Sequence, residues 1–140
     1  MTTTKFRTNK IDKACIIDDD PIFIYGTKRL MAEVGFCKTV LVFENGQDGI
    51  DGLNKITVQG ERLPAVIFLD LNMPIMNGWE FLEDFTRIPN HNREKVIVYI
   101  VSSSIDPREL GRIKNYKVVN NYILKPITKE DLVNILERAS

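Results

Sequence analysis

Short apolar runs alternate with longer segments of helical period along this chain. The runs lie at residues 14–17, 39–43, 65–69, 96–101 and 121–124. Most of them are apolar without interruption and rich in β-branched side chains. Such runs are typical of central strands that are buried on both faces of a parallel sheet. The pattern therefore predicts five strands.

The segment after the first run has the clearest helical signals. Residues 21–34 place apolar side chains on one stripe, and Pro21 suits a first helical position. Because a proline disfavours helical geometry in the residue before it, Asp20 is expected to be the N-cap. Gly35 fits a left-handed stop. We therefore expect a helix over residues 21–34.

Four further helices follow from the same reasoning. Residues 47–58 predict a weaker helix, since Gly49 and Gly52 each cost about 1 kcal/mol relative to alanine. Residues 79–85 carry the third apolar stripe, and the stripe of Leu110, Ile113 and Tyr116 predicts a fourth helix after residue 107. The last helix is expected from 129 to about 139, opened by a capping box at residues 128–131.

Strands that alternate with helices imply right-handed βαβ units and a parallel sheet covered on both faces. The expected fold class is therefore α/β, a doubly wound (βα)5 arrangement. In such open sheets, functional sites form outside the carboxyl ends of the strands. The chemistry of this chain is therefore to be sought where its strands end.

Composition narrows the class of protein. The chain has 140 residues, enough for one domain, with 44% apolar and 27% charged residues. Nineteen Lys and Arg balance nineteen Asp and Glu, so no basic excess indicates nucleic acid or an anionic membrane. Residues 1–12 are polar and are expected to be a flexible tail rather than a signal peptide. Cys15 and Cys37 are interpreted as reduced small hydrophobes, which favours the cytoplasm.

Polar side chains follow four of the predicted strands. The first strand ends in Asp18, Asp19 and Asp20, the third in Asp70, the fourth in Ser102, Ser103 and Ser104, and the fifth in Lys125. Clustered carboxylates repel one another, and a divalent cation relieves that repulsion. Hard oxygen ligands suit Mg²⁺, which Asp19 and Asp70 would bind directly. A carboxylate nucleophile, Mg²⁺, a hydroxyl and a lysine together describe phosphoryl transfer onto an aspartate.

The same residues carry a resemblance to a known family. The matching segments are residues 16–21 (IIDDDP), 70–78 (DLNMPIMNG), 100–104 (IVSSS) and 122–126 (YILKP). With these motifs in this order, the chain resembles the receiver domain of a two-component response regulator over roughly residues 13–138. We expect the receiver domain to occupy residues 13–140.

The resemblance implies a flavodoxin-like sheet of strand order 2-1-3-4-5. It implies that Asp70 is the phosphoacceptor and that Asp19 ligates Mg²⁺ directly, while Asp18 ligates the ion through water or tunes the site. It further implies a third metal ligand in the backbone carbonyl of Asn72, phosphoryl binding by Ser102 and Lys125, and a cis Lys125–Pro126 bond. Tyr122 matches the aromatic rotamer switch, and Asn72 and Ser104 are expected to tune the lifetime of the phosphoryl group.

The expected function is a single-domain switch, not an enzyme. A histidine kinase or phosphotransfer protein would phosphorylate Asp70, and a downstream protein would bind the face formed by residues 106–138. The protein would be a monomer or a phosphorylation-dependent dimer. Three departures from the family pattern are Ser102 in place of threonine, a longer segment at 87–95 and an extended linker at 59–64.

Two other functions are left open. A Mg²⁺-dependent phosphatase or phosphotransferase of the haloacid dehalogenase type would use an aspartyl phosphate in turnover. That class needs a second aspartate two residues after the nucleophile, where this chain has Asn72. The other alternative is a degenerate receiver that serves as a fixed interaction module, against which the complete set of pocket residues argues. The single histidine, His91, is expected in a solvated loop.

Overall fold

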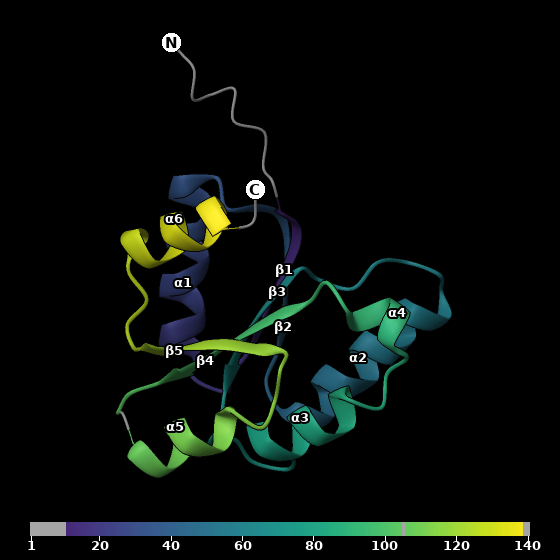
Figure 1. Ribbon diagram of the computed structural model, residues 1–140. Coiled ribbons are helices and arrows are strands. Elements are labelled where there is room, and N and C mark those ends of the chain that lie inside the picture. Colours follow the sequence, from purple (N-terminus) through teal and green to yellow (C-terminus); the bar gives the residue numbers. More distant parts are fainter. Residues whose placement is uncertain (1–10, 105, 139–140) are drawn as a thin grey trace.

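Five parallel strands form one sheet at the centre of the molecule (Figure 1). The computed structural model describes residues 11–104 and 106–138, without the side chains of residues 90 and 91. The strand order is β2-β1-β3-β4-β5, as predicted. The strands are β1 (Ile11–Ile17), β2 (Cys37–Phe43), β3 (Val66–Asp70), β4 (Ile97–Ser102) and β5 (Val119–Leu124).

Helices cover both faces of the sheet. The first face carries α1 (Pro21–Val34) and α6 (Lys129–Arg138), and the second carries α2 (Gly46–Val58), α3 (Gly78–Phe85) and α5 (Pro107–Ile113) (Figure 1). A four-residue helix, α4 (Asn90–Arg93), precedes β4. This is the doubly wound α/β fold that the alternating pattern predicted.

The sheet separates two hydrophobic cores. Ile17, Leu53 and Phe81 belong to the core on the second face, and Ile16 and Leu132 to the core on the first. Adjacent strand residues point to opposite faces of a sheet, so consecutive apolar residues such as Ile16 and Ile17 serve different cores. The continuous apolar runs of the sequence follow from this double burial.

The predicted helix ends are confirmed where local signals were strong. The Asp20 side chain accepts hydrogen bonds from the backbone of Ile22 and Phe23, and Gly35 adopts a left-handed conformation with φ 63°. At α6, Thr128 and Asp131 each accept a backbone hydrogen bond from the other, which is the reciprocal bonding of a capping box.

Several boundaries differ from the prediction. β1 begins at Ile11, which is buried, so the last two residues of the predicted tail belong to the sheet, while residues 1–10 lie outside the described part of the chain. Residues 90–93 form α4 within the segment predicted as a loop, and the side chain of His91 is outside the described residues. α5 ends at Ile113, before Tyr116.

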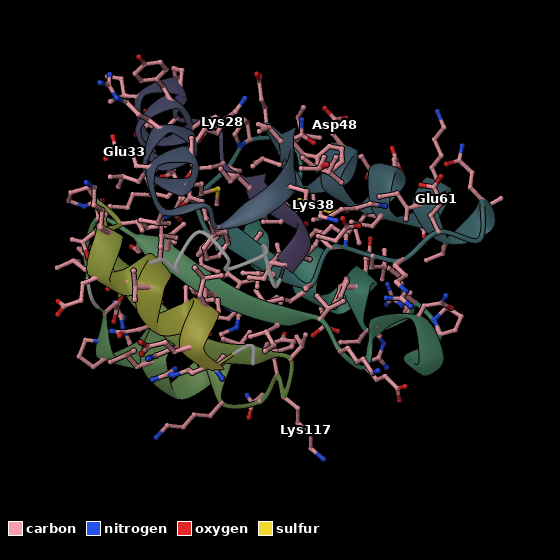
Figure 2. The ribbon with its side chains drawn as sticks, turned by 90° about the horizontal axis from the view of Figure 1, so that it is seen from above. Lys28, Glu33, Lys38, Asp48, Glu61 and Lys117 are labelled. Carbon is pink, nitrogen blue, oxygen red and sulfur yellow. The ribbon has the colours of Figure 1, made fainter. Side chains whose placement is uncertain are left out.

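Charged side chains such as Lys28, Glu61 and Lys117 project from the outer surface (Figure 2). One surface ion pair joins two helices, since Glu33 of α1 lies 2.7 Å from Lys129 of α6. No helix within residues 11–104 and 106–138 has both the length and the apolar character that crossing a bilayer requires. Cys15 and Cys37 are free thiols, as expected.

Candidate functional site

The register of the sheet brings the four predicted strand ends together. Ile17 pairs with Leu69, which places Asp18 beside Asp70 across β1 and β3. Asp70 itself pairs with Val101, one residue before Ser102. Ser102 pairs with Leu124, and its carbonyl accepts a 2.7 Å hydrogen bond from the backbone N–H of Lys125. Parallel pairing therefore sets these residues along one edge of the sheet.

Three carboxylates form a cluster at this edge. One oxygen atom from each of Asp18, Asp19 and Asp70 lies within 4.8 Å of the others. Asp18 is fully buried and Asp70 is 7% exposed, whereas Asp19 is exposed. Carboxylate oxygens at this spacing are the donors that a hard divalent cation prefers. The donor type and the clustering of these side chains therefore suit a divalent cation, as the sequence indicated.

Lys125 partly neutralises the buried acid. Its Nζ lies 2.8 Å from Oδ2 of Asp18, and no other donor among the described residues reaches that oxygen. Asp18 Oδ1 accepts the backbone N–H of Asp20 at 2.9 Å. Burial raises the pKa of Asp18, and the hydrogen bond from Lys125 opposes that rise. The ammonium also lies 4.5 Å from the ring centre of Phe23, a cation–π contact.

Asp70 is the carboxylate with the most altered acidity in the cluster. Burial and the nearby charge of Asp18 raise its pKa to about 6, against the lowering effect of Lys125. Its Oδ1 accepts a 3.3 Å hydrogen bond from the backbone N–H of Asn72. A poorly hydrated carboxylate has a high free energy when ionised, and a bound cation lowers that free energy.

A close backbone contact holds the loop after Asp70. A Cβ at Gly78 would lie 2.6 Å from the carbonyl oxygen of Asp70 and 2.7 Å from Cα of Leu71, so only glycine fits there. The next helix is fixed by a capping box between Asn77 and Glu80. The start of α3 is thereby fixed directly against the end of β3, which positions Asp70.

One carbonyl oxygen connects the hydroxyl of the site to the predicted aromatic switch. Ser102 Oγ donates to the carbonyl of Ser104 at 2.8 Å, and the hydroxyl of Tyr122 reaches the same carbonyl at 2.9 Å. Tyr122 also lies 2.8 Å from Oε1 of Glu109 in α5. Burial raises the pKa of Tyr122, and the Glu109 carboxylate adds to that rise.

The structure thus gathers most of the residues that the sequence singled out. Asp18, Asp19, Asp70 and Lys125 form one charged group, and the Lys125–Pro126 bond is cis. Asp20 serves as a helix cap, as expected. The roles of the Asn72 carbonyl and the Ser104 side chain as ligand and lifetime residue stay predictions.

Two residues of the site were not found from the sequence. The helical period places Phe23 on the buried stripe of its helix without giving it a role in the site, and no motif singles out Glu109. Helical period shows which face of a helix is buried but not which side chain from another element lies against it. The only available signal was their position, since each lies within one turn of a helix start at the carboxyl edge of the sheet.

Fold and site together define a flavodoxin-like α/β protein with an acidic site at the carboxyl edge of its sheet. The family model of the response regulator receiver domain matches residues 14–137, and the chain therefore belongs to this family.

Individual relatives agree with this assignment. The nitrate/nitrite response regulator protein NarL of Escherichia coli K12 is 30% identical over 89% of the chain, which spans only 53% of NarL. A two-component response regulator from Cytophaga hutchinsonii superposes with a TM-score of 0.84 at 31% identity, over 92% of this chain and 96% of that one.

A second solved structure shows a likeness of fold alone. It is the receiver domain of the sensor histidine kinase PA1611 from Pseudomonas aeruginosa, described with a magnesium ion coordinated in its active site cleft. It superposes with a TM-score of 0.72 at 15% identity, over 91% of this chain and 95% of the other.

Proposed function

We propose that this chain is a phosphorylation switch in a phosphorelay, with Asp70 as its phosphoacceptor. The observation that supports this most is the position of Asp70, which is nearly buried within 4.8 Å of two other carboxylates at the carboxyl edge of the sheet. A carboxylate oxygen of Asp70 attacks the phosphorus of a phosphohistidine. A P–O bond forms, the P–N bond breaks, and its electron pair returns to the imidazole of the donor.

The donor set supports Mg²⁺ as the cofactor. Asp18, Asp19 and Asp70 offer oxygen ligands only, and the raised pKa of Asp70 shows how unfavourable the ionised cluster is without a cation. When bound, Mg²⁺ would neutralise charge on the transferred phosphoryl group. The magnesium ion in the PA1611 receiver domain, which has the same fold, supports this assignment.

The contacts of Ser102 and Lys125 suggest how the phosphoryl group would be detected. An aspartyl phosphate adds about two negative charges and strong acceptor oxygens. Lys125 would then turn from Asp18 toward the phosphoryl group, and Ser102 Oγ would leave the Ser104 carbonyl to donate to it. Because Tyr122 shares that carbonyl, its hydrogen bond would change as well.

The output follows from the elements that these side chains belong to. Tyr122 lies on β5 and is joined to α5 through Glu109, so a change at Ser104 would alter how α5 lies against the sheet. We propose that residues 106–138, which include α5, β5 and α6, bind the downstream protein differently in the two states. Asn72 stands where a haloacid dehalogenase needs its second aspartate, which favours a switch over a hydrolase.

Intact-mass measurement tests the proposal. The full chain is incubated with Mg²⁺ and either acetyl phosphate or phosphoramidate, and the mass of one added phosphoryl group is expected. Asp70→Asn should abolish the adduct, whereas Asp51→Asn, at an exposed carboxylate on α2, should retain it. An adduct that persists in Asp70→Asn would overturn the assignment.

The two alternatives give different results in the same experiment. A folded chain that forms no adduct would be a fixed interaction module, and rapid hydrolysis of many phosphate esters would indicate a hydrolase. Tyr122→Phe separates phosphorylation from its detection, since it removes only the hydroxyl that bonds to Ser104 and Glu109. We expect this variant to form the adduct while α5 loses most of its phosphorylation-dependent chemical-shift change.

A further inference from the structure

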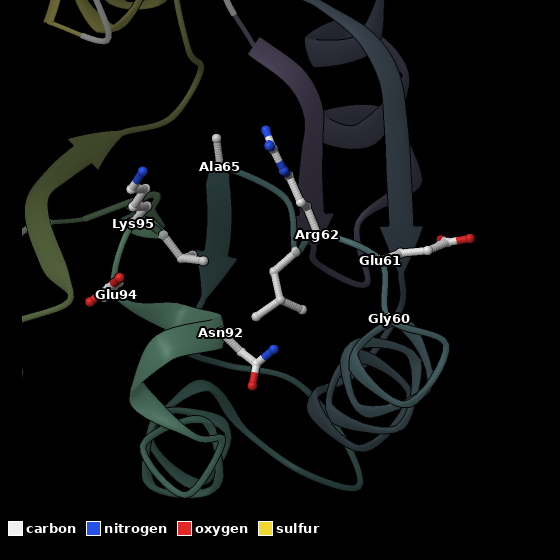
Figure 3. A pocket seen from close by; sticks show the side chains of 9 residues that line it. Gly60, Glu61, Arg62, Ala65, Asn92, Glu94 and Lys95 are labelled. Carbon is white, nitrogen blue, oxygen red and sulfur yellow. The ribbon is translucent and has the colours of Figure 1, made fainter.

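A pocket lies at the amino ends of β3 and β4, opposite the end of the sheet that holds Asp70. It has a volume of about 460 Å³ and opens between the linker that leads into β3 and the segment that leads into β4 (Figure 3). Its wall includes Ala65 and Val96, each the residue directly before a strand. The full length of β3 separates this pocket from the proposed phosphoacceptor.

Most residues that line the pocket belong to residues 59–64 and 87–95, the two segments that the resemblance led us to expect as longer than the receiver pattern. Just beyond these segments, the backbone N–H of Ile97 donates a 2.9 Å hydrogen bond to the carbonyl of Ala65. Neither segment takes part in the proposed phosphorylation. Both departures from the family pattern therefore meet around one hollow that the switch mechanism does not use.

Some of the charged side chains at this pocket have an ion-pair partner and others do not. Glu61 is held by Lys13 at 3.6 Å. Arg62 and Lys95 form no side-chain hydrogen bond or ion pair with any of the described residues. In Figure 3 their nitrogen tips lie on the same side of the pocket, to either side of Ala65, and the carboxylates of Glu61 and Glu94 point outward. Two exposed cations that have no side-chain partner among the described residues therefore line this pocket.

Part of the lining of the same pocket is apolar. Leu63 and Val96 are both buried and line it, while Asn92 adds an amide on the α4 side. Pockets of roughly 300–1,000 Å³ with apolar walls and a few convergent polar groups are typical of small-molecule sites. Arginine suits the planar, two-oxygen geometry of carboxylate and phosphate groups, and lysine adds a point charge.

We propose that this pocket binds a small organic anion. Its carboxylate or phosphoryl group lies between Arg62 and Lys95, and its apolar body rests on Leu63 and Val96. An inorganic anion offers the charge but no apolar body, so it binds more weakly than an anion that carries one.

Amide chemical shifts of the full chain test this site. Metal-free protein is titrated with benzoate and, separately, with phenyl phosphate, at constant ionic strength. We expect saturable shifts centred on Gly60, Ala65 and Val96, and weaker binding of inorganic phosphate. The tighter of the two organic probes identifies which anionic group the pocket prefers.

Paired variants decide whether the proposed cations are responsible. Arg62→Gln combined with Lys95→Gln should weaken binding by about tenfold or more, the equivalent of one charge-assisted hydrogen bond. Lys28→Gln is the matched control, because it removes an exposed cation that lines a separate hollow beside α1. Both altered residues of the double variant are exposed, so the fold should be retained, as circular dichroism would verify.

Two results would overturn the proposal. One is a shift pattern that stays linear in probe concentration and spreads over exposed cations in general. The other is equal affinity in the double variant and the wild type. Binding should persist in Asp70→Asn, so this test can fail or succeed independently of the phosphorylation switch.

Discussion

Asp70 makes the metal-free protein less stable than its hydrophobic cores alone would make it. The carboxylate is nearly buried beside Asp18, and these two causes raise its pKa from 3.8 to about 6. A native state with the higher pKa binds a proton more readily than the unfolded chain does. The free energy of unfolding therefore falls as the pH rises through this range, because the carboxylate must ionise inside the protein.

Asp70→Asn should remove this penalty. Above about pH 6, and without Mg²⁺, we expect the free energy of unfolding of the variant to exceed that of the wild type by about 1–2 kcal/mol. This value is reduced for partial solvent screening. The gain should disappear below about pH 4, where Asp70 is protonated in both states. Urea denaturation as a function of pH measures it. Mg²⁺ should stabilise the wild type more than the variant, and a variant less stable at about pH 7 would contradict this account.

Ile75 is the one non-glycine residue of the described chain with a positive φ. Its φ is 69°, in the left-handed region that β-branched residues rarely adopt, and its side chain is 80% exposed. The exposed side chain gains little from burial that would offset this strain. The strain lies five residues after Asp70, in the loop that Gly78 fixes against β3.

Ile75→Gly should therefore stabilise the protein by about 0.5–1 kcal/mol, since glycine adopts positive φ without steric cost but loses more chain entropy. The matched control is Ile22→Gly, at an equally exposed isoleucine (82%) that lies in α1. There glycine should destabilise by about 0.5–1 kcal/mol. Thermal unfolding of both variants measures the two signs, and the same sign for both would refute the strain at Ile75.

At the scale of elements, α3 and α5 are joined by a cluster of aromatic and charged side chains. Arg112 of α5 lies 4.1 Å from the ring centre of Trp79, the single tryptophan of the chain. Tyr116, just beyond α5, packs against the same ring and donates a 2.6 Å hydrogen bond to Glu83 of α3. Trp79 therefore reports on the position of α5.

Phosphorylation of Asp70 should change Trp79 fluorescence, because α5 moves relative to α3 in the proposed switch. Arg112→Ala removes the cation from the ring and should reduce this change by about half or more, since that contact contributes most when the ring is partly buried. Arg108→Ala is the control on the same helix, as Asp106 is the one ion-pair partner of Arg108 among the described residues. An unchanged fluorescence response in Arg112→Ala would show that the Arg112 contact does not produce the signal, and it would contradict this prediction.

An element could be predicted from the sequence where the residues that fix it lie within or next to it in the chain. α1 was predicted in full because Asp20, Pro21 and Gly35 act within the helix ends. For α2 the glycines indicated weakness, yet a Cβ at Gly52 would overlap the ring of Phe43 and one at Gly49 would lie 2.9 Å from Ile17. These glycines let the helix approach the sheet closely, a requirement that no local pattern contains.

The same distinction applies to the site. The strand ends were visible in the sequence, and parallel pairing alone was enough to bring Asp18 next to Asp70. The partners of the site side chains were not visible, because they depend on rotamers and on elements far apart in the chain. Lys125 pairs with Asp18, although the family resemblance indicated a role toward the phosphoryl group only.

At the scale of the whole molecule, one sheet supports two cores. Leu53 is fully buried in the core under α2 and α3, and Leu132 is fully buried in the core under α1 and α6. Of the two described cores, Trp79 packs only against the one under α2 and α3. Because every central strand contributes to both cores, we expect the described domain to unfold as one cooperative unit.

Leu132→Ala tests this cooperativity with a probe on the opposite face. Loss of the buried side chain should destabilise the protein by about 2–5 kcal/mol. If the sheet couples the cores, Trp79 fluorescence and far-ultraviolet circular dichroism should show the same lowered urea midpoint, although Trp79 lies far from the substitution. Leu53→Ala, on the Trp79 face, should behave in the same way. If Leu132→Ala left the fluorescence midpoint unchanged while the circular dichroism curve became biphasic, the two faces would be independent, and a change at Asp70 could not reach both through the strands between them.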